Sequence, residues 1–447
     1  MEDFNLIEYI TSKRDHGIIV WMFNIGTEKF WNKDNYSIKD TKENVIVNHI
    51  EEMNLLLTRK QDILILRNKP CETYLSDLEK AGFEIPRILC PGQKNEEKSI
   101  AELVLDDEVI ISELTKLGDS NEIRYFVPYG VSYLEEQIAH KCHLFLVGSI
   151  SQINKKINNK VFSRKLAENL GLFITEGEIC NSLQEVEAAY YNLKKRFNKV
   201  IIKQPFGASG KGLYIVDSDN GMKSVLLILS RFIRINHETE WIVEGWYDKK
   251  ADINYQVYVS KTGKVNTFCI KEQMVKNTVY IGSLIPPRIS VQTYNKYIEY
   301  GNLIGKELFM MGFNGILGID SIITVNDIIV PVIEINARFT LSTYISFLEN
   351  KYPNRLIYSF YEKLQLVDGM NYEMFQKLLI DKTLMFNRQN NEGVLCYTSE
   401  TINSDATNNN GRLFILIVAK SYTKVEEYKT GIGELIKKIS HNWEGKK

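Results

Sequence analysis

The sequence predicts a protein of mixed α/β and α+β structure. Short, continuous apolar runs at residues 17–24 and 62–66 are typical of buried parallel strands, which indicates an α/β region at the start of the chain. Residues 315–338 hold two β-rich runs around an Asn-Asp turn, which indicates a hairpin. A strand pattern at residues 412–419, followed by a helical pattern at 423–439, favours a small α+β domain at the end.

These patterns divide the chain into three expected domains. We expect an N-terminal α/β domain at residues 1–148, a central domain at 149–348 and a C-terminal α+β domain at 349–447. A third apolar run closes the first domain, and amphipathic helical patterns fill much of the remainder. The apolar run covers residues 142–148, and the helical patterns cover residues 99–117, 158–170, 293–311 and a segment that begins near residue 181.

The composition excludes several classes of protein. The chain has 447 residues, of which 44% are hydrophobic and 25% charged, as in ordinary soluble globular proteins. Its net charge of −1 gives no bulk attraction for nucleic acid or for an anionic membrane. No apolar run approaches the roughly 20 residues that span a bilayer, and the N-terminus lacks the pattern of a signal peptide. The six cysteines form no CxxC pair, so we expect a cytoplasmic protein without a disulfide framework.

A glycine-rich loop between two strand patterns is the most informative stretch of the chain. The first strand pattern ends on Lys203 and the second begins at Leu213. Backbone N–H groups in such a loop form a concavity that binds anions, and Lys203 adds a positive charge beside it. The loop is not a Walker A loop, because Gly212 rather than Ser or Thr follows Lys211. Taken alone, it is equally well explained as a plain turn.

The hairpin carries a set of oxygen ligands. Asp320 lies on its first strand, while Glu334 and Asn336 lie two residues apart on its second strand and therefore share a face. Three oxygen ligands on adjacent strands can hold magnesium, which shares its shell with substrate phosphates. Arg338 is in phase with them, although a surface ion pair is the simpler explanation of this hairpin in isolation. Pro331 indicates an edge strand or a bulge.

The order of these motifs resembles that of the ATP-grasp carboxylate ligases. The resemblance covers residues 123–348: a first lysine at Lys160, a second at Lys203 before the glycine loop, a hinge strand at 240–246, and the metal-binding hairpin. Segments at residues 126–136 and 393–397 are similar to peptide ligases of the pheganomycin type and to amino acid–carrier-protein ligases of the butirosin type. The resemblance implies an ATP-grasp fold with an N-terminal pre-ATP-grasp domain.

The resemblance also implies a set of ligands and roles. ATP would be bound together with one or two magnesium ions, for which manganese is the alternative. The lysines and the loop would neutralise the phosphates, and Arg338 would neutralise the transferred phosphoryl group, because phosphoryl transfer depends on positioning and charge. The implied nucleotide contacts are Lys160, Lys203, Gly207, Ser209, Gly210, Lys211, Gly212, Glu244 and Asp252, and the implied metal ligands are Asp320, Glu334 and Asn336.

Other positions remain open between two interpretations. Arg288 lies where related enzymes carry a basic residue near the γ-phosphate or the substrate carboxylate, and a bidentate guanidinium suits either role; the alternative is a plain loop arginine. Glu244 and Asp252 have solvated or capping carboxylates as their alternatives. Lys271 could also face the cleft, although a surface strand lysine is the simpler interpretation. Gly318 occupies the position of an arginine found in D-alanine ligases, which argues against that activity.

The expected function follows from the resemblance. The leading hypothesis is an ATP-dependent ligase that activates an amino-acid or peptide carboxylate as an acyl phosphate and joins it to an amine, in specialised-metabolite (antibiotic) biosynthesis. The alternative transfers the same acyl group to the thiol of an acyl-carrier protein. A non-catalytic nucleotide-binding protein is a third reading. We expect no nucleic-acid or membrane partner, and the sequence leaves both substrates and the oligomeric state open.

Overall fold

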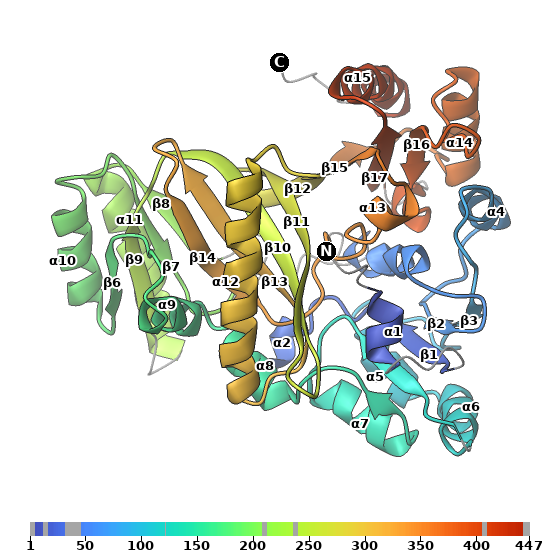
Figure 1. The fold of residues 1–447 in the computed structure, drawn as a ribbon, viewed down its shortest axis with the longest axis horizontal. Coiled ribbons are helices and arrows are strands. Elements are labelled where there is room, and N and C mark those ends of the chain that lie inside the picture. Colours follow the sequence, from blue (N-terminus) through green and yellow to red (C-terminus); the bar gives the residue numbers. More distant parts are fainter. Residues whose placement is uncertain are drawn as a thin grey trace.

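The protein is described by a computed structural model. It describes residues 5–11, 17–31, 46–120, 122–207, 212–235, 240–404 and 409–440. Three sheets organise these residues: a five-stranded parallel sheet, a four-stranded antiparallel sheet and an eight-stranded antiparallel sheet. Figure 1 shows the first at the lower right, the second at the left and the third across the middle and upper right.

The N-terminal part is the parallel sheet with helices around it. Its strands are β1 (Ile19–Met22), β2 (Ile63–Ile65), β3 (Arg87–Leu89), β4 (Tyr125–Pro128) and β5 (Phe145–Leu146), and its helices are α1 (Leu6–Ile10), α2 (Glu28–Trp31), the 3-10 helix η1 (His49–Leu56), α4 (Glu72–Lys80), α5 (Ile100–Leu105), α6 (Glu108–Gly118) and α7 (Tyr133–Lys141). The strand order is β3-β2-β1-β4-β5. The chain order therefore reverses between β1 and β4, the kind of place where open α/β sheets bind ligands.

The helical pattern over residues 99–117 corresponds to two helices in the structure. Residues Asp106 and Asp107 separate α5 from α6. The Asp107 carboxylate accepts the backbone N–H groups of Val109 and Ile110, so it caps a new helix.

The left-hand lobe of Figure 1 is the four-stranded sheet with two helices beside it. Its elements are β6 (Gly177–Cys180), α10 (Leu183–Leu193), β7 (Val200–Lys203), β8 (Leu213–Val216), α11 (Asp219–Ile235) and β9 (Trp241–Gly245), and it is preceded by α8 (Ser151–Ile157) and α9 (Lys160–Asn169). The strand order is β6-β9-β7-β8. Lys203 pairs with Leu213 across β7 and β8, which confirms that the glycine-rich segment connects an antiparallel pair of strands.

The eight-stranded sheet joins the central and C-terminal parts of the chain. Its elements are β10 (Lys249–Val259), β11 (Val265–Lys276), β12 (Val279–Ile285), α12 (Val291–Met310), β13 (Gly315–Thr324), β14 (Ile329–Asn336), α13 (Leu348–Lys351), β15 (Leu356–Gln365), α14 (Tyr372–Asp381), β16 (Gly393–Cys396), the 3-10 helix η2 (Glu400–Ile402), β17 (Asn410–Ala419) and α15 (Tyr422–Ile439). The strand order is β14-β13-β10-β11-β12-β15-β17-β16. Because β15 pairs with β12, the sheet continues across the domain boundary predicted at residue 348.

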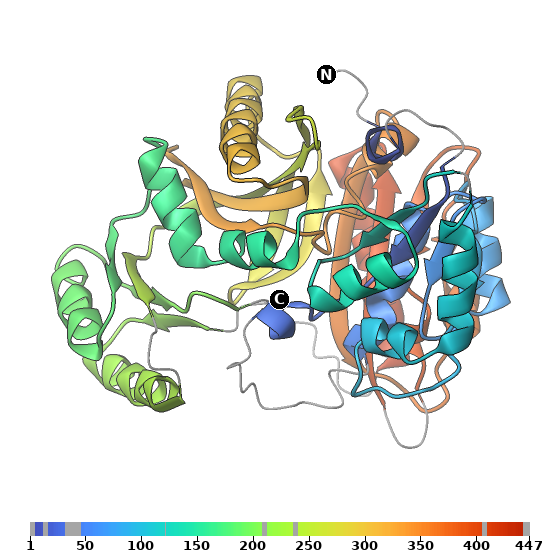
Figure 2. The same cartoon turned by 90° about the horizontal axis from the view of Figure 1, so that it is seen from below.

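The two faces of this sheet differ in chemistry around β10. Ile253, Tyr255 and Val257 pack into a core with Tyr297 and Ile304 of α12. This long helix crosses the sheet in Figure 1 and lies against one face of it in Figure 2. Since side chains alternate along a strand, the residues between these apolar ones point to the opposite face. That opposite face carries polar side chains and forms the floor of the candidate site. The edge position of β14 also explains how the sheet tolerates Pro331.

Candidate active site

The carboxylates of the hairpin lie directly opposite each other. Asp320 pairs with Glu334 and Gly318 pairs with Asn336 across β13 and β14, so the three predicted metal ligands share one face. The amide of Asn336 donates to Asp320 Oδ2 at 3.2 Å. A second amide, from Asn254 of β10, donates to Asp320 Oδ1 at 2.8 Å. The structure therefore brings together the oxygen-rich set that the sequence predicted.

Two effects raise the pKa of Asp320 to about 6. The larger is burial of the carboxyl group, and the second is repulsion from the Glu334 carboxylate across the hairpin. Hydrogen bonds from Asn254 and Gln273 oppose both effects. Two carboxylates held this close together suit a divalent cation, which would relieve their repulsion.

Lys160 is the cation next to this pair. Its ammonium group is buried and donates to Glu334 Oε1 at 3.0 Å and to the carbonyl oxygen of Gly207 at 2.8 Å. The residue begins α9 directly after Asn159, whose side chain caps that helix. Helix α9 also holds the edge of β14, because Ser163 Oγ accepts the N–H of Ile335. One residue thus links the helix, the glycine-rich segment and the carboxylates.

Lys203 and Glu244 meet in a buried ion cluster that also contains Arg164. Lys203 Nζ lies 2.5 Å from Glu244 Oε2, and Arg164 Nη1 lies 2.5 Å from Glu244 Oε1. Burial opposes ionisation of Glu244, but the two cations prevail and hold its pKa below the usual value. The sequence predicted Lys203 and Glu244 as site residues but not Arg164, because Arg164 lies far from Glu244 along the chain. That Lys203 and Glu244 contact the nucleotide remains a prediction.

The remaining predicted nucleotide residues are placed in part. Gly212 closes the β7–β8 connection, since its carbonyl accepts the N–H of Gln204 at 2.8 Å, and its φ of +75° favours glycine. Asp252 lies on the same face of β10 as Asn254 and forms an ion pair with Lys249 at 2.7 Å. The predicted contacts Ser209, Gly210 and Lys211 lie outside the residues that the structure describes.

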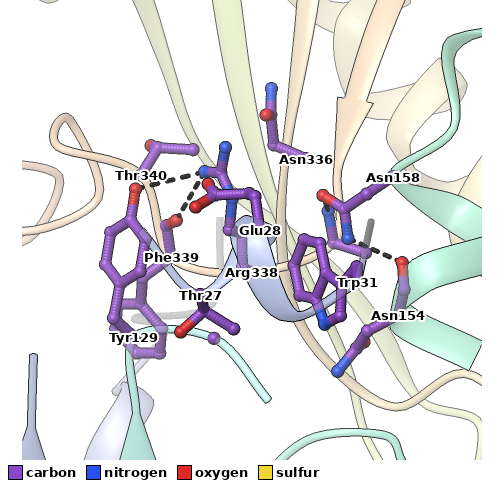
Figure 3. Close-up of polar contacts among 12 residues, drawn as sticks. Thr27, Glu28, Trp31, Tyr129, Asn154, Asn158, Asn336, Arg338, Phe339 and Thr340 are labelled. Carbon is purple, nitrogen blue, oxygen red and sulfur yellow. Dashed lines mark hydrogen bonds and ion pairs between the residues drawn. The ribbon is translucent and has the colours of Figure 1, made fainter. Parts of the chain in front are cut away.

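Arg338 is held by the N-terminal domain (Figure 3). Its guanidinium Nε lies 2.7 Å from Glu28 Oε1 of α2, and its Nη1 donates to the hydroxyl of Tyr129 at 3.2 Å. Both partners follow the strands β1 and β4, where the order of the parallel sheet reverses. A small cavity beside Arg338 is lined by Tyr129, Gly148 and Asn314 among others. The predicted catalytic arginine thus lies between the two domains, beside the metal-ligand strand.

Arg288 lies away from the carboxylates. It pairs bidentately with Glu272, and its Nε donates to Glu272 Oε2 at 2.9 Å. Glu272 is opposite Ile253 in the β10–β11 register, so it belongs to the face covered by α12 rather than to the face of Asp320. The Arg288 side chain is 63% exposed. The structure does not bring this predicted catalytic residue together with the others.

We expect Arg288→Gln to reduce turnover by less than about tenfold, because an exposed ion pair contributes only about 0–1 kcal/mol. Steady-state kinetics on the purified variant measure this. A loss of a hundredfold or more, with unchanged thermal stability, would instead support the catalytic role that the sequence suggested.

Lys271 differs most from its expectation. The sequence suggested a surface lysine, yet this side chain is fully buried and donates to the carbonyl oxygen of Ser342 at 2.7 Å and to Ser346 Oγ at 2.5 Å. Burial lowers its pKa to about 8. Lys271 is opposite Asn254, which is opposite Asp320, so these side chains form one row with Glu334 on the polar face of the sheet.

The sequence and the fold were compared with those of known proteins. Residues 251–342, which include the carboxylate hairpin, match the ATP-grasp domain family. The chain is 28% identical over 355 residues to the [butirosin acyl-carrier protein]–L-glutamate ligase of Niallia circulans, covering 78% of each protein. The chain carries an ATP-grasp domain and resembles the ADP-forming ATP-grasp ligases. It is also 22% identical over 193 residues to the N5-carboxyaminoimidazole ribonucleotide synthase of Bacillus subtilis, covering 43% of this chain and 48% of that protein.

Solved structures share the fold of this chain. An ADP complex of an N5-carboxyaminoimidazole ribonucleotide synthetase superimposes with a TM-score of 0.57 at 15% identity, covering 94% of this chain and 98% of the other. A biotin carboxylase from Campylobacter jejuni in a β-γ-ATP complex gives a TM-score of 0.59 at 12% identity, covering 93% and 91%. These matches confirm the ATP-grasp fold predicted from the sequence, including the N-terminal α/β domain.

The donor set of Asp320, Glu334 and Asn336 fits a hard cation bound together with nucleotide phosphates. Two carboxylates and an amide oxygen supply few protein ligands, and magnesium in such sites completes its shell with phosphates and water. Among the described residues, no group of three or more His, Cys, Asp or Glu side chains could hold a metal ion. No helix in the described part of the chain is long and apolar enough to cross a membrane.

Proposed function

We propose that this ATP-grasp ligase activates an amino-acid or peptide carboxylate with ATP and joins it to an amine. The observation that carries the proposal is the face shared by Asp320, Glu334 and Asn336, with Lys160 3.0 Å from Glu334. Bound magnesium there would neutralise the charge of the triphosphate. Lys160 and Lys203 would add positive charge along the same phosphates.

The proposed reaction has two displacements. A carboxylate oxygen of the acyl substrate attacks the γ-phosphorus of ATP, the bond to the β-γ bridging oxygen breaks, and ADP leaves. An amine nitrogen then attacks the acyl carbon, loses a proton, and inorganic phosphate leaves. Arg338, two residues after Asn336 in the sequence, would neutralise the transferred phosphoryl group.

Transfer to a carrier protein is the second candidate. It is favoured by one finding, the similarity to a ligase whose name gives an acyl-carrier protein and L-glutamate as its substrates. The chemistry differs only in the second step, in which a phosphopantetheine thiolate replaces the amine. The residues described above serve either acceptor.

An assay of phosphate release distinguishes the two acceptors. The protein is supplied with ATP, magnesium and a panel of amino acids, with and without a phosphopantetheinylated carrier protein. Release that needs a second amino acid but no carrier supports amide formation. Release that needs the carrier supports thioester formation, and the absence of ADP with every carboxylate contradicts both.

A further inference from the structure

A chain of buried side chains leads away from the Asp320 carboxylate. Asn254 Nδ2 donates to Asp320 Oδ1 at 2.8 Å, and Gln256 Nε2 donates to Asn254 Oδ1 at 2.6 Å. Thr343 Oγ1 then donates to Gln256 Oε1 at 2.8 Å. Asn254, Gln256 and Thr343 are each at most 1% exposed. Buried amides of this kind are costly unless they are hydrogen-bonded, so the chain is a specific feature of the fold.

The hydrogen bonds between Thr343 and Asp320 all run in one direction, which the groups at the two ends determine. Thr343 Oγ1 accepts the backbone N–H of Thr340 at 2.8 Å, lies 3.0 Å from the Thr340 hydroxyl, and makes its shortest donated hydrogen bond to Gln256 Oε1 at 2.8 Å. The Gln256 amide must then turn its NH2 group toward Asn254, and Asn254 must turn its NH2 group toward Asp320. At the far end, an ionised carboxylate only accepts hydrogen bonds. Each donor in the chain therefore points toward the proposed metal ligand.

Gly318 makes the space in which this chain runs. It lies opposite Gln256 across β10 and β13. A Cβ atom at this position would lie 2.8 Å from Gln256 Nε2, 3.0 Å from Thr340 Cγ2 and 3.4 Å from Asn254 Nδ2, so a larger residue would have to displace the Gln256 amide. The glycine that distinguishes this sequence from D-alanine ligases is thus explained by the amide that occupies the same space.

We propose that Gln256 is a positioning residue of the ligase, which fixes the orientation of the Asp320 carboxylate through Asn254 for metal binding. The inference rests on the proposed function, because it assumes that Asp320 is a metal ligand. Thr343 belongs to the segment that follows Arg338, so the same chain ties that segment to the metal ligand. Hydrogen bonds that orient a metal ligand typically change metal affinity by about 10–100-fold.

Two variants interrupt the chain by different routes. Gln256→Met keeps the length of the side chain but removes its donor and acceptor. Gly318→Ala keeps every polar group and pushes the Gln256 amide aside. The matched control is Thr267→Val, which removes a buried hydroxyl from the other face of the sheet, where Thr267 bonds to Ile298 of α12 at 3.4 Å. The control changes packing against the helix and leaves the Asp320 chain intact.

Binding of Mn²⁺ in the presence of ADP is measured for each protein by the electron paramagnetic resonance signal of free Mn²⁺. We expect both chain variants to raise the dissociation constant of Mn²⁺ by about 10–100-fold, while the control stays within about threefold of wild type. The affinity for ADP without metal should be unchanged in all of them.

Other outcomes are equally informative. Folded Gln256→Met or Gly318→Ala protein that binds Mn²⁺ as tightly as wild type overturns the inference. Should Gln256→Met fail to fold, Gly318→Ala alone decides the matter. Wild-type protein that binds neither ADP nor Mn²⁺ overturns the proposed function instead, so the two failures are distinguishable.

Discussion

Replacing Asp320 by Asn should reduce ATP turnover by at least about a thousandfold. The substitution preserves the shape of the side chain and removes the charge that would hold the cation beside Glu334. Charge stabilisation of this kind contributes several kcal/mol, and each 1.36 kcal/mol corresponds to about tenfold in rate. ADP release by the purified variant measures the effect. Turnover within tenfold of wild type would remove Asp320 from the metal site.

The same variant should make the metal-free fold more stable at neutral pH. The pKa of Asp320 is raised to about 6 from a reference of 3.8, so the folded state disfavours its ionised form. The resulting loss of folding stability is complete above pH 6 and decreases as the pH falls from 6 to 3.8. It vanishes below pH 3.8, where Asp320 is protonated in both the folded and the unfolded state. We expect Asp320→Asn to stabilise the protein in chelator at pH 7.5 by on the order of 1–3 kcal/mol.

Thermal unfolding in chelator at pH 7.5 and near pH 4 measures this dependence. The gain of the variant should shrink toward pH 4, and added Mg²⁺ with ADP should stabilise wild type more than the variant. A variant that is less stable than wild type at pH 7.5 would show that the carboxylate is needed by the fold itself.

Glu244→Ala should have the largest effect on stability. The substitution leaves the ammonium of Lys203 and the guanidinium of Arg164 buried without the carboxylate that both contact at 2.5 Å. Removing one partner of a buried ion pair typically costs about 3–5 kcal/mol. Chemical denaturation of the full chain measures the loss.

The matched control for this effect is Glu240→Ala. Glu240 pairs with Lys165 at 3.1 Å, and the two side chains are 41% and 53% exposed. We expect its loss to change stability by about 0–1 kcal/mol. Equal effects of the two substitutions would show that the Glu244 cluster is solvated and contributes little to the fold.

The sequence was most informative where the chemistry is local. The carboxylate hairpin, the strands flanking the glycine-rich segment and the N-terminal parallel strands each follow from residues close together in the chain. The alternation that places Glu334 and Asn336 on one face requires no tertiary knowledge. Pro331 similarly indicated an edge strand, and β14 is one.

Contacts between distant segments could not be predicted in this way. The partner of Arg338 is Glu28, and the partner of Glu244 is Arg164. Each pair depends on how two separate units pack, which no spacing along the chain reveals. Lys271 shows the same limit, since the register of β11 against β10 turns its side chain toward the buried polar face. Gln256 and Asn254 were missed because amides in a strand carry no sequence signal of function.

The transfer of oxygen from the substrate carboxylate to phosphate tests whether the reaction passes through an acyl phosphate. The protein is incubated with ATP, magnesium and an amino acid whose carboxylate carries ¹⁸O, together with an amine acceptor or a phosphopantetheinylated carrier. Attack of that carboxylate on the γ-phosphorus puts one ¹⁸O atom into the acyl phosphate bridge, and this atom leaves with inorganic phosphate when the acceptor attacks the acyl carbon. With an acyl phosphate intermediate, we expect ADP and singly labelled phosphate in the ³¹P spectrum. Unlabelled phosphate, or label in AMP with release of pyrophosphate, would contradict it.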